Sequence, residues 1–95
     1  MAPPFDPDSV TPLYEQAADY VAGLVASGTL APGQKLASER DLADQWGIGY
    51  QTVRRAMREL RERGLVVSRV GKGTFIAGKP EAPADLAARA SQPHG

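Results

Sequence analysis

Basic side chains are concentrated in one part of this chain, and their chemistry is the binding of phosphates and base edges. Residues 35–79 contain ten Lys and Arg side chains against five Asp and Glu, whereas residues 1–34 contain four acidic side chains and no basic one. The whole chain has a net charge of zero, but its middle is positive. A localised basic segment, rather than a high overall pI, is the electrostatic footprint of phosphate binding.

The densest basic run lies between Tyr50 and Arg63 and has the periodicity of an amphipathic helix. Its apolar residues recur at i, i+3, i+4 and i+7 and predict the core face: Val53, Ala56, Met57 and Leu60. The opposite face carries the polar residues Gln51, Arg54 or Arg55, Arg58 and Glu62. Side chains at the start of such a helix can reach base edges, and Gln can pair bidentately with adenine. Alternatively, the arginines only pair with Glu59 or Glu62; such pairs contribute about 0.2–0.5 kcal/mol, too little to prevent phosphate contact.

A second basic cluster follows in a predicted hairpin. Residues 65–69 and 73–77 have the composition of strands and flank Val70-Gly71-Lys72. Gly71 and Gly73 close the hairpin. Because they lack side chains, they also permit the backbone to come close to the wall of a nucleic-acid groove, with Lys72 next to phosphate. The segment is not a P-loop, because the preceding glycine spacing and the following helix are absent.

The elements that position these residues follow from caps and turns. Thr11 and Pro12 are expected to start a helix over about residues 12–27, preceded by a flexible arm at residues 1–11. A turn at Pro32-Gly33 and a short extended piece at residues 34–36 follow. Ser38 is the expected N-cap of a second helix, with Asp41 in the acidic position of a capping box, and Gly47 ends this helix.

Ala43, Gly47 and Val53 have the spacing of a helix-turn-helix, in which a small residue, a tight turn and a buried residue let two helices approach. The order of elements predicts an α+β fold: a winged helix-turn-helix of three helices, with a short first strand and a C-terminal β-hairpin wing. The domain is expected at residues 12–78. Residues 79–95 are expected to be a flexible or weakly helical tail, in which residues 84–90 could form two marginal turns.

Over roughly residues 12–78 the chain resembles the N-terminal DNA-binding domain of the GntR family of transcriptional regulators. The matching blocks are Pro12-Leu13-Tyr14, residues 28–33, Leu36-Ala37-Ser38-Glu39-Arg40, Leu42-Ala43, Thr52-Val53-Arg54-Arg55-Ala56, Leu60, Gly64-Leu65-Val66 and Gly71-Lys72-Gly73-Thr74-Phe75. The resemblance implies a homodimer on a pseudo-palindromic operator, acting for example as a repressor. It also implies that the third helix enters the major groove and the wing meets the minor groove.

By the same resemblance, the base-contacting arginines fall on Arg40 and Arg54, and the wing glycine falls on Gly71. Three residues depart from the family pattern: Ala37 replaces a proline, Gly49 a Ser or Thr, and Tyr50 a frequent arginine. These departures bear on sequence preference, although Gly as an N-cap costs only a few tenths of a kcal/mol. The full set of expected DNA contacts is Ser38, Arg40, Gly49, Tyr50, Gln51, Thr52, Arg54, Arg55, Arg58, Arg69, Gly71, Lys72, Gly73 and Thr74.

Other classes of function find little support in the sequence. There is no cysteine, and the one histidine, His94, lies in the polar tail, so no catalytic set, metal site or cofactor is expected. Without an apolar run or signal sequence, we expect a cytoplasmic, nucleoid-associated bacterial protein. About 17 residues follow the wing, too few for a small-molecule effector pocket, so a stand-alone short regulator is favoured over a truncated one. The alternative function is a winged-helix module that docks an acidic protein partner.

Overall fold

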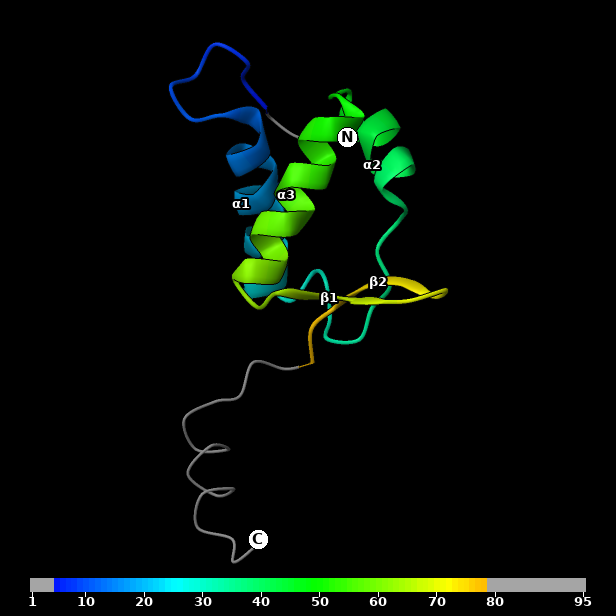
Figure 1. The fold of residues 1–95 in the computed structure, drawn as a ribbon. Coiled ribbons are helices and arrows are strands. Elements are labelled where there is room, and N and C mark those ends of the chain that lie inside the picture. Colours follow the sequence, from blue (N-terminus) through cyan, green and yellow to red (C-terminus); the bar gives the residue numbers. More distant parts are fainter. Residues whose placement is uncertain (1–4, 79–95) are drawn as a thin grey trace, which may run out of the picture.

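The computed structural model describes residues 5–78 and contains three helices and one antiparallel hairpin (Figure 1). The helices are α1 (Leu13–Ala26), α2 (Glu39–Trp46) and α3 (Tyr50–Glu62), and the strands are β1 (Val66–Arg69) and β2 (Gly73–Ile76). Helix α3 lies between α1 and α2, and the hairpin crosses one end of the helices. This is the predicted α+β winged helix-turn-helix.

One face of α3 forms the centre of the core. Its four predicted core residues, Val53, Ala56, Met57 and Leu60, are all buried, as are Ala17, Ala18 and Val21 of α1. The small alanines let the two helix backbones approach closely, so that the larger side chains interdigitate. No polar or charged side chain is buried among residues 5–78, so the core costs no desolvation of unpaired groups.

The turn between α2 and α3 has the predicted geometry. The Asp41 N–H donates to the Ser38 Oγ at 3.1 Å, which makes Ser38 the N-cap of α2. Gly47 ends the helix in the left-handed conformation with φ 68°, and its N–H bonds the Ala43 carbonyl at 2.9 Å. Two residues later Gly49 begins α3 with an extended backbone and no side-chain cap. The short turn joins the end of α2 to the start of α3, and Arg40 of the first turn of α2 lies beside Tyr50 of α3.

The wing is joined to the segment before α2. Strands β1 and β2 pair from Val66 with Ile76 to Arg69 with Gly73. The expected short first strand is reduced to a single bridge between Lys35 and Phe75. It stays this short because Gly33, at φ 83°, turns the chain just before it and Ser38 starts α2 just after it.

Helix α1 begins differently from the prediction. Thr11 is not its N-cap: Pro12 occupies that position, and no side chain caps the helix. The Thr11 carbonyl instead accepts a hydrogen bond of 2.7 Å from the Gln16 side chain, which also bonds the backbone N–H and carbonyl of Asp6, both at 2.8 Å. Gln16 therefore takes the place of the expected cap by holding the preceding segment.

That segment belongs to the expected flexible arm, yet in the structure packing begins at Phe5 rather than at Thr11. The Phe5 ring lies edge-to-face against Tyr20 and Trp46, with centroids 5.7 Å apart in both pairs, and Tyr20 and Trp46 are themselves 6.1 Å apart. Such perpendicular ring pairs are favoured by the aromatic quadrupole. Phe5 thus connects α1 to α2. The predicted tail at residues 79–95, with its two marginal turns, lies outside the described residues.

An ion-pair network also links α1 to α3. The Arg63 guanidinium bonds Glu59 Oε2 through Nε at 3.0 Å and Asp19 Oδ1 through Nη2 at 2.9 Å. Its hydrogen bonds to Glu59 and Asp19 raise the pKa of Arg63 above its ordinary value. Arg63 thus joins the end of α3 to α1 by two charged hydrogen bonds.

The aromatic cluster predicts that Phe5 contributes to the stability of the fold, although it lies eight residues before α1. We expect Phe5→Ala to lower the free energy of unfolding by about 2 kcal/mol, because a half-buried ring and two edge-to-face pairs are lost. The matched control is Val10→Ala, since Val10 lies in the same segment and is 100% exposed. Urea unfolding of both variants measures the difference; equal midpoints would contradict the packing of this segment.

Candidate nucleic-acid interface

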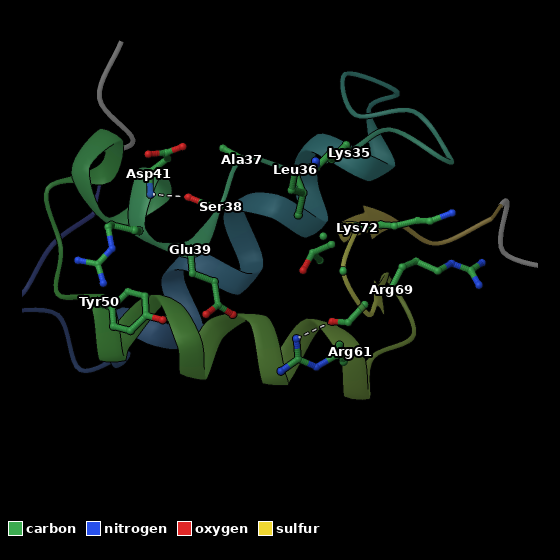
Figure 2. A pocket seen from close by; sticks show the side chains of 15 residues that line it. Lys35, Leu36, Ala37, Ser38, Glu39, Asp41, Tyr50, Arg61, Arg69 and Lys72 are labelled. Carbon is green, nitrogen blue, oxygen red and sulfur yellow. Dashed lines mark hydrogen bonds between the residues drawn. The ribbon is translucent and has the colours of Figure 1, made fainter.

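A broad hollow lies between the start of α2, one side of α3 and the wing (Figure 2). In this view Tyr50 lies toward one end, and Arg69 and Lys72 lie toward the other. The predicted contact residues that line it are Ser38, Arg40, Tyr50, Arg69, Gly71, Lys72, Gly73 and Thr74. The structure thus brings residues from three separate parts of the sequence to one concave surface.

The end of the hollow nearest the turn is built around Tyr50. The Cζ of Arg40 lies 5.3 Å from the centre of the Tyr50 ring, and the Cζ of Arg54 lies 5.9 Å from it. Arg54 also pairs with Glu39, with 3.9 Å between its Nε and the carboxylate. The Arg54 side chain remains 52% exposed, so this pair is a weak surface contact that a phosphate or a base can replace.

The wing forms the other end. Gly71, at φ 74°, lets the hairpin turn, and the Lys72 N–H bonds the Arg69 carbonyl at 2.9 Å. Arg69 and Lys72 are both exposed. The cationic ends of these two side chains are therefore available to an anion beside the tip of the wing.

Seven lining residues are not among the predicted contacts: Lys35, Leu36, Ala37, Glu39, Asp41, Arg61 and Ser68. The Lys35 side chain passes over Gly73, where an added Cβ would lie 2.8 Å from its Cε. Arg61 donates from Nη1 to the Ser68 Oγ at 3.2 Å and so links α3 to the wing. A signal for Arg61 was present, since it follows Arg54 by seven residues and must share its helix face.

Two predicted arginines lie elsewhere. The Arg55 Cζ is 4.0 Å from the centre of the Tyr14 ring, on the α1 side of α3. Arg58 joins Tyr14 and Arg55 around a separate small hollow that also includes Glu59 and Glu62. Arg55 and Arg58 are exposed but are not brought to the hollow of Tyr50.

The remaining predicted contacts lie at the start of α3. Gln51 is exposed and Thr52 half-buried, and neither lines the hollow. Gly49 precedes them as the N-cap; an added Cβ there would meet only the Thr52 Oγ1 at 3.8 Å. The missing Ser or Thr at this position is therefore not a consequence of crowding.

The charge of the hollow is mainly positive. Its lining has the cationic side chains Lys35, Arg40, Arg61, Arg69 and Lys72 and the acidic side chains Glu39 and Asp41. Such a surface attracts polyanions, except near the carboxylates of Glu39 and Asp41. Within the described part of the chain there is no group of His, Cys, Asp or Glu able to hold a metal ion, and no helix has the length and hydrophobicity needed to cross a membrane.

Most of this chain is similar in sequence to known bacterial transcriptional regulators. Residues 13–76 match the family described as bacterial regulatory proteins, gntR family. The chain is 41% identical over 81 residues to the HTH-type transcriptional regulator Rv1152 of Mycobacterium tuberculosis, which covers 85% of this chain and 67% of that protein. It is 45% identical over 65 residues to the regulator SmoD of Agrobacterium fabrum, covering 68% of this chain. That match spans only 28% of SmoD, so this chain corresponds to a part of such longer relatives.

Solved structures agree at the level of the fold. YtrA from Sulfolobus acidocaldarius, a GntR-family transcription factor, superposes with a TM-score of 0.76 at 32% identity over 95% of this chain and 94% of that one. The DNA-binding domain of AraR in complex with operator ORX1 gives a TM-score of 0.68 at 31% identity, covering 81% of this chain and 92% of that one. The family and these relatives are transcriptional regulators and not enzymes.

The positive φ of Gly73 predicts that a side chain at this position lowers the stability of the protein. We expect Gly73→Ala to lower the free energy of unfolding by about 1–3 kcal/mol, because φ is +121° and the Cβ would displace Lys35. Gly23→Ala is the control: this glycine lies within α1, its Cβ would meet nothing within 4 Å, and a gain of about 0.5–1 kcal/mol is expected. Thermal unfolding compares them; a Gly73→Ala protein as stable as the wild type would contradict the expectation.

Proposed function

Since the chain belongs to the GntR family of bacterial regulatory proteins and carries that family's DNA-binding domain, we propose that the hollow between α2, α3 and the wing receives one half-site of a double-stranded operator. A winged helix-turn-helix places the start of its recognition helix against base edges in the major groove. Here that helix is α3, with Tyr50, Gln51 and Arg54 in its first turns. The wing then follows the neighbouring backbone toward the minor groove.

The observation that carries this proposal is the convergence of separate cations on one concave surface. Arg40 lines this hollow from α2, and Arg69 and Lys72 line it from the wing. Arg54 of α3 is not part of the lining, but its Cζ lies 5.9 Å from the centre of the ring of Tyr50, which is part of it. A duplex carries phosphates on both sides of each groove, so one bound segment can meet both ends of the hollow together. The Asp41 N–H is already bonded to the Ser38 Oγ, so the N–H groups of Glu39 and Arg40 are the donors that the first turn of α2 would offer to a phosphate.

The contacts divide into two classes under this proposal. Arg40, Arg54 and Gln51 are the residues that read base edges, with Tyr50 beside them, and the residues of the wing bind the DNA backbone. Arg55 and Arg58 lie on the α1 side of α3, so they are proposed to contact only phosphates at the edge of the site. At the start of α3, Gly49 is proposed to let the protein backbone come close to the DNA, and Thr52 is proposed to make a minor polar contact with it.

The proposal also includes the oligomeric state of the protein on DNA and its location in the cell. Two copies are proposed to bind a pseudo-palindromic operator as a dimer, in the cytoplasm and at the nucleoid. Repression then follows where the site overlaps a promoter. Half-sites on one face of the duplex lie about 34 Å apart, or a multiple of that distance.

The direct test is an unbiased selection of bound duplexes with the purified chain at two salt concentrations. The expected result is an inverted repeat with that spacing, bound more tightly than a scrambled duplex of the same length. A protein-docking module with a basic face would bind both duplexes equally, with the same salt dependence. Equal competition by the scrambled duplex would therefore reject the proposal.

Arg54 and Arg55 are adjacent in sequence and lie on different sides of α3, which gives a matched pair for mutation. We expect Arg54→Ala to weaken binding to the selected operator by about 1–3 kcal/mol and to relax the preference at one base position. Arg55→Ala is expected to weaken all duplexes alike. Fluorescence anisotropy on the operator and on single-base variants measures both effects; an identical profile for the two variants would contradict the division of roles.

Lys72 is expected to act through phosphate alone. Lys72→Ala should lower affinity uniformly across sequences and reduce the slope of log K against log salt by about one unit. Val70→Ala in the same loop is the uncharged control, since Val70 is 103% exposed and should leave the slope unchanged. A loss confined to particular base positions would show that the wing reads sequence instead.

A further inference from the structure

We propose that Tyr50 is a positioning residue whose ring holds Arg40 and Arg54 in the orientation that reads bases. This inference rests on the proposed DNA binding and deepens it. Tyr50 is the first residue of α3, and its ring has a guanidinium group of each arginine within about 6 Å of its centre.

The geometry places the ring between the two helices of the helix-turn-helix. Arg40 comes from the first turn of α2, whereas Tyr50 and Arg54 come from the first turns of α3. The two guanidinium carbons lie 5.3 and 5.9 Å from the ring centre, within the distance of about 6 Å at which the ring quadrupole attracts a cation. One ring therefore contacts both arginines to which base contacts were assigned.

The ring offsets two costs that arise when Arg40 and Arg54 lie close together in space. Like charges repel, and long side chains that move freely must be ordered when DNA binds, which costs affinity. A shared aromatic surface offsets the repulsion and removes part of the rotational freedom before binding. The arginines then meet the duplex already oriented, so the gain is largest for the sequence whose bases match that orientation.

Glu39 completes the unit on the side of Arg54. Its carboxylate lies 3.9 Å from the Nε of Arg54 and is 27% exposed, so it is the more sheltered member of the pair. Because Glu39 approaches Nε, we infer that the terminal Nη groups of Arg54 remain available for bidentate contact with a guanine edge. Figure 2 shows Glu39 and Tyr50 projecting into the same hollow from α2 and α3.

The experiment separates the ring from its hydroxyl group. Tyr50→Phe keeps the ring, and discrimination between the selected operator and its single-base variants should stay within about twofold of the wild type. Tyr50→Leu removes the ring, and discrimination should fall by about fivefold or more, as expected for two partly exposed cation–π contacts. Because Tyr50 is 38% exposed and starts a helix, thermal unfolding should change little in either variant.

A second measurement needs no DNA. Ring-current shifts of the Arg40 and Arg54 side-chain protons, measured by NMR on the free protein, should be present in the wild type and in Tyr50→Phe and lost in Tyr50→Leu. Tyr14→Leu is the matched control, because the Tyr14 ring lies on Arg55 outside the hollow. It should leave both the discrimination and the shifts of Arg40 and Arg54 unchanged.

The other possible results would reject either the positioning role of Tyr50 or the proposed DNA binding. Equal losses in Tyr50→Phe and Tyr50→Leu would make the hydroxyl a direct base contact and end the positioning role. Full discrimination in Tyr50→Leu, or wild-type arginine protons without ring-current shifts, would end it as well while leaving operator binding intact. A wild-type protein that discriminates between no duplexes would reject the proposed function, and the positioning role with it.

Discussion

The burial of one stripe of α3 against α1 fixes the direction in which every other side chain of α3 points. Val53, Ala56, Met57 and Leu60 are removed from water, and a rotation of the helix would expose them at a cost of about 25 cal/mol for each Å². The arginines on the remaining circumference are thereby divided. Arg54 and Arg61 point to α2 and the wing, and Arg55 points to Tyr14. The hydrophobic core thus determines the electrostatic surface.

The wing depends on a second constraint, its attachment to the segment before α2. The bridge between Lys35 and Phe75, together with a bond of 2.9 Å from the Leu36 N–H to the Thr74 carbonyl, holds β2 beside the chain that enters α2. Arg61 and Ser68 add a contact from α3. The strands that carry the basic tip are therefore attached both to the segment before α2 and to α3. The backbone thus sets the distance between this tip and Tyr50.

Local signals predicted most of the fold. The Ser38 cap, the left-handed Gly47 and the buried face of α3 each depend on residues a few positions apart, so their physics can be seen in the sequence. The α+β winged fold follows from their order. Predictions failed where partners are distant: Phe5 packs on Tyr20 and Trp46, and Gln16 rather than a Thr11 cap organises the start of α1. The site shows the same division, because Lys35 enters it only through pairing with β2, and a helix face alone could not tell that Arg55 turns to Tyr14.

The aromatic cluster has one practical property of its own. The chain contains a single tryptophan, and that residue, Trp46, is the last of α2, in contact with the ring of Phe5 upstream of α1. Its indole emission therefore senses both the seating of the N-terminal segment and the helix that precedes the turn. The native protein carries an intrinsic optical reporter at the back of the helix-turn-helix, and no dye need be attached to follow rearrangement there.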